Sequence, residues 1–203
     1  MTTGHYVCGV KRKIHRQDII QSGYDLFYDK GYGVTGVSEI TQRIGIPKGS
    51  FYNHFKSKEE FGIAVLDHYM AGNQEFLKES LLNDKYSALE NLKRFFNDFI
   101  EMQESVLFCS KGCLMGNMTM ELADVNETFQ GKTKKGFENS TAVFEACLEK
   151  AKAQKEIPED TEVQLMANFI VNSWQGATLR MKADKSTDAL KKFYRVIFDR
   201  VLS

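Results

Sequence analysis

Apolar residues recur every three or four positions along almost the whole chain, and only two prolines, at positions 47 and 158, interrupt it. Because proline breaks helices, the chain keeps long stretches in which a helix can run. No stretch shows the sustained alternation of apolar and polar residues that a strand requires. With 203 residues, 42% of them hydrophobic and 27% charged, the chain can bury a sizeable core. The sequence therefore predicts an all-α globular protein.

Helix start and stop signals place the expected helices. Ser57 is a good N-cap, and Glu59 and Glu60 in the following turn are favoured by the helix dipole. Gly31 and Gly45 stand where the first two helices should end. The expected helices cover residues 12–30, 37–44, 48–55, 58–82, 86–104, 114–123, 128–154, 161–181 and 187–202.

The net charge of zero hides an uneven distribution. Residues 1–58 hold nine lysines and arginines against four acidic residues, whereas the rest of the chain holds 18 against 23. A basic N-terminal end suits a polyanion such as DNA. Attachment to an anionic membrane surface, through Lys11, Arg12, Lys13 and Arg16, is an alternative. It would need an amphipathic stretch with exposed aromatic residues, and the single tryptophan, Trp174, lies far along the chain, so we expect no membrane partner.

Several classes of site are not indicated by the sequence. No apolar run approaches the ~18 residues of a membrane span and no apolar leader is seen, so we expect a soluble, cytoplasmic protein. The four cysteines are too few and too scattered for a disulfide scaffold, and the histidines do not join them at metal-ligand spacing. Motifs for phosphate-binding loops, zinc hydrolases and serine hydrolases are missing. We therefore expect no metal, no cofactor and no enzymatic activity.

The segment 48–58, KGSFYNHFKSK, carries the strongest functional signal. Two short helices around a glycine turn, with a longer helix before them, are the layout of a three-helix DNA-binding unit. Phe51 and Phe55, four residues apart, can anchor one face in the core. The residues left for the outer face are of the types that contact phosphates and base edges: Lys48, Gly49, Ser50, Tyr52, Asn53 and His54. A helical adaptor that binds only protein is the alternative, and it leaves this segment without a purpose.

Residues 36–61, from GVSEITQRIGIPKGS to FYNHFKSKEEF, resemble the helix-turn-helix and the next helix of the TetR family of bacterial repressors. Residues 27–32, FYDKGY, resemble the end of the first helix in that family. The resemblance implies a DNA-binding domain over residues 1–57, and an effector-binding and dimerisation domain over residues 58–203. It also implies a homodimeric repressor that binds a palindromic operator on double-stranded DNA and is released by a small effector.

The same resemblance assigns roles in DNA binding. Lys48, Gly49 and Asn53 fall at positions that approach base edges. Ser50, Tyr52, His54 and Lys58 fall at phosphate-contacting positions. Gly36 lacks the hydroxyl that is frequent at the head of the second helix, and Thr35 and Ser38 are the substitutes we expect.

The C-terminal two-thirds is rich in phenylalanine and methionine, which suits an adaptable apolar cavity. By analogy with TetR-like proteins, the residues expected to line a pocket for a small apolar effector are Phe95, Phe99, Met102, Met118, Phe144 and Trp174.

A cysteine next to this region adds an alternative mechanism. Residues 111–124, KGCLMGNMTMELAD, resemble a segment of a TetR subgroup that includes sensors of reactive small molecules. Cys113 near a helix N-terminus, with Lys111 beside it, could have its thiolate stabilised. A redox or electrophile sensor acting through Cys113 is therefore an alternative to simple effector binding, and a small buried thiol is the other interpretation.

The last two expected helices have wide apolar faces that suit a four-helix bundle across a two-fold axis. The residues expected at that interface are Ala167, Ile170, Trp174, Gly176 and Ala177, with Leu190, Tyr194, Ile197 and Val201.

Overall fold

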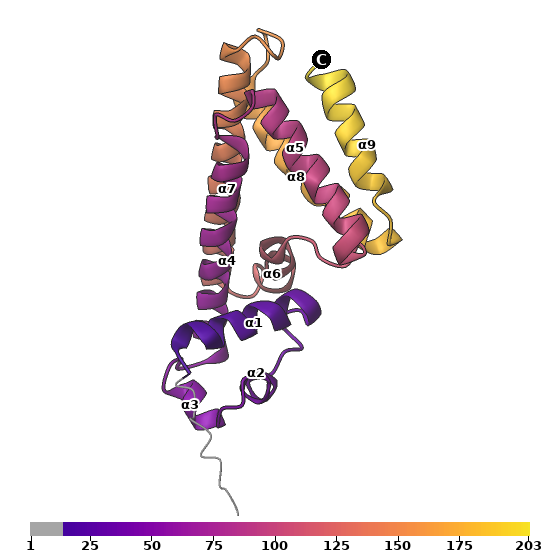
Figure 1. Ribbon diagram of the computed structural model, residues 1–203. Coiled ribbons are helices and arrows are strands. Elements are labelled where there is room, and N and C mark those ends of the chain that lie inside the picture. Colours follow the sequence, from indigo (N-terminus) through magenta and orange to yellow (C-terminus); the bar gives the residue numbers. More distant parts are fainter. Residues whose placement is uncertain (1–13) are drawn as a thin grey trace, which may run out of the picture.

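The structure is a computed structural model that describes residues 14–203 (Figure 1). Within this range the chain forms helices joined by turns, and no strand occurs. The elements are α1 (Arg16–Lys30), α2 (Val37–Arg43), α3 (Lys48–Tyr52), α4 (Lys58–Leu81), α5 (Ala88–Met102), η1 (Gln103–Leu107), α6 (Leu114–Leu122), α7 (Glu127–Ala153), α8 (Val163–Asp184), α9 (Asp188–Val196) and η2 (Ile197–Val201). The expected all-α fold is confirmed. Each expected helix is present with ends shifted by a few residues, and the expected start at residue 12 lies outside the described residues.

The first three helices form a head at one end of the molecule, with α1 lying above α2 and α3 (Figure 1). Gly45 lies between α2 and α3 with φ +69°, a backbone conformation that favours glycine. Helix α1 approaches α4 closely at Gly23, where a Cβ atom would lie 2.2 Å from the Phe61 ring. The head therefore depends on small residues at a turn and at a helix crossing.

The apolar core of the head extends beyond position 57, the expected domain boundary. It joins α1, α2 and α3 to the first turns of α4, to α6 and to the start of α7, and α4 also enters a second core. The division at residue 57 stays a prediction. The buried members of the head core are Ile19, Ile20, Leu26, Phe27, Ile40, Phe51, Phe55, Phe61, Val65, Leu66, Leu114, Met115, Met118 and Phe129.

The second core lies among α4, α5, α7, α8 and α9. Helices α4 and α7 run side by side from the head to the far end of the molecule, and the short helix α6 lies beside the head (Figure 1). Phe96 is fully buried at the centre, with its ring centroid 4.7 Å from that of Trp174 and 5.1 Å from that of Phe193. This core positions the helices that enclose the cavity described below.

The local chemistry of the helix ends agrees with most of the start signals. The Ser57 hydroxyl accepts a hydrogen bond from the Glu60 amide at 3.0 Å, so the expected N-cap is confirmed. Pro47 precedes α3 without a side-chain cap, also as expected. The sequence did not indicate that the helix after Met102 continues as the π-helical segment η1, which ends at Phe108 and Cys109 in left-handed conformations. Cys109 and Cys113 therefore do not share a helix.

The apolar side chains expected at a dimer interface are largely used inside the chain. Ala167, Ile170 and Trp174 of α8 are buried, and so are Leu190 and Ile197. They pack in the second core, because α8 and α9 turn this face toward α5 and α7. The structure thus corrects the expected face, and the apolar residues that α8 leaves exposed lie on another side.

Candidate functional site

Helix α3 and the turn after it have a polar surface because Phe51 and Phe55 are anchored in the head core. Phe51 and Phe55 are buried, with ring centroids 5.5 Å apart. The Phe61 ring of α4 lies 5.2 Å from the first and 5.0 Å from the second. Three rings in mutual contact fix which side of this short helix faces outward.

The outward side of α3 and of the turn after it is formed by small, hydrogen-bonding and cationic residues. Tyr52 is 48% exposed, and its ring packs edge-on against Phe51 at 5.3 Å between centroids. Within residues 14–203, Lys48 forms no ion pair, so its charge is available to a partner. We call the following residues the recognition surface, of which Ser50 and His54 are half-buried and the others exposed: Lys48, Gly49, Ser50, Tyr52, Asn53 and His54.

The structure corrects one predicted DNA contact at the head of α2. Thr35 is fully buried, and its hydroxyl donates a hydrogen bond to the Gly31 carbonyl at 2.7 Å. The hydroxyl closes the turn after α1 and is therefore not available to a phosphate. Ser38, in the first turn of α2, is exposed and stays a predicted contact.

Lys58 is held against the turn between α1 and α2. Its ammonium lies 4.3 Å from the centroid of the Tyr32 ring and donates to the Gly33 carbonyl at 3.1 Å. Partial burial lowers the pKa of Lys58. A phosphate contact by Lys58 stays a prediction, and it would have to coexist with these two interactions.

Several other basic side chains of the head are engaged within the chain, whereas Lys56, in the turn after α3, is exposed and forms no ion pair within residues 14–203. Lys30 pairs with Glu39, and Arg43 pairs with Asp25 at 3.2 Å. The Arg16 guanidinium lies 4.6 Å from the centroid of the Phe55 ring. Lys11, Arg12 and Lys13 lie outside the described residues. The positive charge available on the described head therefore lies at α3 and the turn after it, at Lys48 and Lys56.

A cavity of about 790 Å³ lies between α4, α5, α7 and α8. This volume is in the range that holds a small organic molecule. Aromatic rings form much of its wall, with Phe95 5.7 Å from Phe144 and Phe99 5.1 Å from Trp174 between centroids. Six of the seven residues predicted for a ligand site line it: Phe95, Phe99, Met102, Cys113, Phe144 and Trp174.

Met118 does not line this cavity. It is fully buried in the head core, together with Leu114 and Met115 of the same helix. Helix α6 packs against α4 and α7, and its apolar face is turned into the head. The expectation for Met118 is corrected for this reason.

The wall also contains polar residues that the sequence did not indicate, among them Tyr28, Tyr69, Gln175 and Thr178. Tyr28 belongs to α1, which the expected boundary assigned to another domain. Gln175 and Thr178 lie one and four positions after Trp174 on α8. The sequence signal that could have predicted these wall residues is the presence of polar residues beside a predicted pocket residue. Such residues are equally typical of an exposed helix face.

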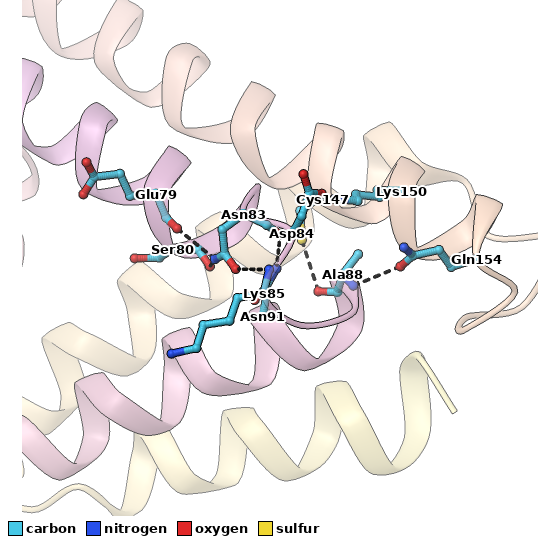
Figure 2. Close-up of polar contacts among 10 residues, drawn as sticks. All are labelled: Glu79, Ser80, Asn83, Asp84, Lys85, Ala88, Asn91, Cys147, Lys150 and Gln154. Atoms are coloured by element: carbon cyan, nitrogen blue, oxygen red, sulfur yellow. Dashed lines mark hydrogen bonds and ion pairs between the residues drawn. The ribbon is translucent and has the colours of Figure 1, made fainter.

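The outer end of the cavity lies at the turn between α4 and α5, which Figure 2 shows in detail. The Asn83 side chain donates to the Glu79 carbonyl at 2.8 Å and accepts from the Lys85 amide at 3.0 Å. The Asn91 side chain donates to the Asn83 carbonyl at 2.9 Å. This network fixes the turn, and the Lys85 side chain extends away from it (Figure 2).

Cys113 lies at the inner end of the cavity as the N-cap residue of α6. Its sulfur accepts hydrogen bonds from the Gly116 amide at 3.3 Å and from the Tyr69 hydroxyl at 3.5 Å. Lys111, expected to act on this thiol, instead pairs with Asp29 of α1 at 3.0 Å. Cys113 is therefore a half-buried thiol with two neutral hydrogen-bond donors.

Helix α6 joins the inner end of the cavity to the head. At its start, the Tyr28 hydroxyl of α1 donates to the Gly112 carbonyl. At its end, the Glu121 carboxylate accepts from the Gly33 amide at 2.6 Å and from the Tyr32 amide at 3.3 Å. Both ends of one short helix thus hold α1 and the turn that follows it.

No helix among residues 14–203 is long and apolar enough to cross a membrane. In the same range, no group of histidine, cysteine and carboxylate side chains is arranged to hold a metal ion.

Comparison with known proteins covers both the head and the rest of the chain. The family described as "Bacterial regulatory proteins, tetR family" matches residues 19–65, and "Tetracyclin repressor-like, C-terminal domain" matches residues 88–197. The HTH-type transcriptional repressor DhaR of Mycobacterium sp. (strain GP1) is 33% identical over 187 residues, which are 92% of each chain.

Solved structures agree with these sequence relatives. The crystal structure of a regulatory protein TetR from Rhodobacter sphaeroides is 28% identical with a TM-score of 0.82, over 89% of this chain and 95% of that one. The crystal structure of the reduced form of NemR from Escherichia coli is 26% identical with a TM-score of 0.83, over 91% of this chain and 95% of that one. The similarity extends over the head and the helices that enclose the cavity.

Proposed function

Because this chain belongs to the TetR family of bacterial transcriptional regulators, we propose that it is a repressor that binds a palindromic operator as a homodimer. A small effector in the cavity between α4, α5, α7 and α8 releases the operator. The observation that carries this proposal is the recognition surface on α3. Phe51 anchors the helix in the core, while Lys48 and Asn53 lie exposed beside it.

Double-stranded DNA is the partner that this surface fits. A short helix with cationic and hydrogen-bonding side chains enters the major groove and contacts base edges and phosphates. Such a helix makes too few contacts for tight specific binding alone, and two copies in one dimer double them. Lys48, Gly49 and Asn53 are proposed to face bases, and Ser50, Tyr52 and His54 to contact phosphates. Binding chromosomal DNA places the protein in the cytoplasm.

A stripe of exposed apolar residues on α8 is the proposed dimer interface. Leu165, Phe169 and Leu179 are exposed by 63%, 47% and 66%, and their spacing puts them on one side of the helix together with exposed Gly176. Val196 of α9 is also exposed. Apolar patches of this kind mark interaction surfaces, and a two-fold axis lets α8 pack against its own copy.

The effector acts by favouring one arrangement of the two heads over another. Its contacts at the inner end of the cavity bear on the start of α6, at Gly112 and Cys113. When the effector displaces the start of α6, the helix moves the turn after α1 through the hydrogen bonds of the Glu121 carboxylate. A coupling free energy of about 1–3 kcal/mol changes operator affinity roughly 5- to 150-fold.

A gel-shift assay on the DNA upstream of the protein's own gene tests the proposal, with a salt titration to separate phosphate attraction from base reading. We expect a discrete complex that survives excess random-sequence DNA and weakens steeply with salt. Binding to random DNA with equal affinity would contradict operator recognition, and no binding to any duplex would contradict the DNA-binding role itself.

Thiol-based sensing through Cys113 is not better supported than effector binding, because Lys111, the cation expected to stabilise the thiolate, is paired with Asp29. A purely protein-binding adaptor does not account for the recognition surface. The names of the matching families and of the relatives describe transcriptional regulators, and we assign no catalytic activity to the chain.

A further inference from the structure

Among residues 14–203, the cavity has charged residues only where it meets solvent. Four charged residues line it, namely Glu79, Lys85, Arg94 and Asp98, and each of them is exposed. Two are acidic and two are basic, so this rim has no net preference for an anion or a cation. Every buried or half-buried residue of the wall is apolar or carries an uncharged polar group.

Uncharged hydrogen-bonding groups gather at the inner end, next to the start of α6. Thr178 is 5% exposed, and its hydroxyl oxygen has no hydrogen-bond partner among the described residues. The half-buried amide of Gln175 forms no hydrogen bond in that range either. Both side chains adjoin α6, since a Cβ at Gly112 would lie 3.0 Å from the Thr178 methyl carbon and one at Gly116 would lie 3.1 Å from Gln175 Oε1.

The Tyr69 hydroxyl completes this group. Its hydrogen bond to the Cys113 sulfur, at 3.5 Å, has a weak acceptor. Burial raises the pKa of Tyr69 well above its usual value, so this hydroxyl stays protonated and neutral. A buried hydroxyl without a hydrogen-bond partner, such as that of Thr178, costs free energy. A bound molecule that supplies the missing partner removes this cost.

We propose that the effector is an uncharged molecule with an apolar body and one carbonyl or hydroxyl oxygen that binds among Thr178, Gln175 and Tyr69. The inference rests on the effector role of the cavity proposed above and adds the chemical class of the ligand. A carboxylate or an ammonium at this end would lose its hydration without an opposite charge in the wall. Its burial would cost more than three neutral hydrogen bonds return.

The apolar body occupies the aromatic part of the wall. Phe95 and Phe144 meet edge to face, as do Phe99 and Trp174, so both ring faces and ring edges are presented. Trp174 is the only tryptophan of the chain, and its fluorescence therefore reports occupancy of the cavity directly.

The test uses five probes on one phenylbutane skeleton: 4-phenyl-2-butanone, 4-phenyl-2-butanol, butylbenzene, 4-phenylbutanoate and 4-phenylbutylamine. Dissociation constants are measured on the full chain by Trp174 fluorescence and by calorimetry. We expect the ketone and the alcohol to bind most tightly, butylbenzene more weakly, and the two charged probes at least about tenfold more weakly than the ketone.

Variants then locate the oxygen. Thr178→Val and Gln175→Leu should each weaken the ketone about 2- to 10-fold and leave butylbenzene unchanged, because each removes one hydrogen bond. Thr141→Val, on α7 and outside the cavity wall, is the matched control and should change neither. Thermal unfolding of each variant checks that it folds.

The outcomes separate the ligand class from the repressor role. Equal or tighter binding of a charged probe overturns the inference, as does a ketone affinity that Thr178→Val and Gln175→Leu both leave unchanged. Absence of binding by all five probes at millimolar concentration overturns both the inference and the effector role. If the probe affinities follow the expected order but no probe releases operator DNA, the inference on the ligand class is supported and the repressor mechanism is contradicted.

Discussion

Phe51 and Tyr52 are neighbours in the sequence with opposite tasks. The first is fully buried and anchors α3, and the second is half-exposed beside Lys48 and Asn53. An aromatic pair of this kind shows why composition alone does not separate core from contact residues. Their positions relative to the helix axis decide the role of each.

Replacement of the exposed member tests the recognition surface. Tyr52→Ala should weaken operator binding about tenfold per head through loss of a phosphate contact, measured by fluorescence anisotropy. Tyr52→Phe, which keeps the ring against Phe51, should lose part of that affinity only. Probe binding at Trp174 should be unchanged in both, and an unaltered operator affinity for Tyr52→Ala would remove the residue from the contact surface.

The buried thiol of α7 gives a second test at this scale. The Cys147 thiol donates to the Ala88 carbonyl at 3.4 Å, and burial raises the pKa of Cys147 to about 12 from 9.0 (Figure 2). Because alkylation needs the thiolate, iodoacetamide at pH 8 should modify Cys147 about a thousandfold more slowly in the folded chain than in denaturant. Mass spectrometry of tryptic peptides measures both rates, and similar rates would contradict the burial of this thiol.

The same pKa shift has a consequence for stability. The pKa of Cys147 is higher in the folded chain than in the unfolded chain. The contribution of this thiol to the free energy of unfolding is therefore fully present below pH 9 and is lost as the pH rises from 9 toward 12. Between pH 9 and pH 12, the free energy of unfolding should therefore decrease less in Cys147→Ala than in the unmodified chain. Urea titrations at each pH measure this decrease.

At the scale of elements, the crossing of α1 and α4 requires a residue without a side chain. A Cβ at Gly23 would lie 2.2 Å from the Phe61 ring and 2.9 Å from Val65. Gly23→Ala should therefore lower the free energy of unfolding by about 1–3 kcal/mol, measured by urea denaturation. Gly72→Ala, exposed on α4 with no atom near its Cβ position, should instead raise it by about 0.5–1 kcal/mol. Equal effects at the two sites would contradict the close helix crossing.

Helix α6 is the element that connects effector and DNA in this account. Glu121→Gln should leave operator affinity near its original value, because the recognition surface is untouched. The coupling free energy between a releasing ligand and the operator should fall to less than half, since the amide of the variant holds the Gly33 and Tyr32 backbone more weakly than the carboxylate does. Asp124→Asn, an exposed neighbour, is the control. Undiminished release in Glu121→Gln would show that coupling takes another route.

Periodicity and turn chemistry were enough to predict the helices, because these signals are local. Phe51 and Phe55 were correctly assigned to the core for the same reason. Thr35 and Met118 were misplaced because their burial depends on contacts with Gly31 and with α4, which spacing along the chain does not reveal. The apolar face of α8 was misassigned likewise, since Trp174 meets Phe96 and Phe99 of α5 only in the folded chain.

At the scale of the whole molecule, the exposed stripe on α8 should hold two chains together. Phe169→Glu with Leu179→Glu should shift the protein toward monomers, because two like charges would face their own copies across the axis. Sedimentation velocity measures the association. Val125→Glu, at an apolar residue that is even more exposed and lies outside this stripe, should leave the association unchanged. A dimer that persists in the double variant would place the interface elsewhere.

Two recognition surfaces, held by paired chains, are proposed to read one duplex together. Hydroxyl-radical footprinting of the full chain on the DNA upstream of its own gene tests this most directly. We predict two protected half-sites related by a two-fold axis and about 34–36 Å, or a whole number of helical turns, apart. A single protected half-site, or protection without symmetry, would contradict the claim.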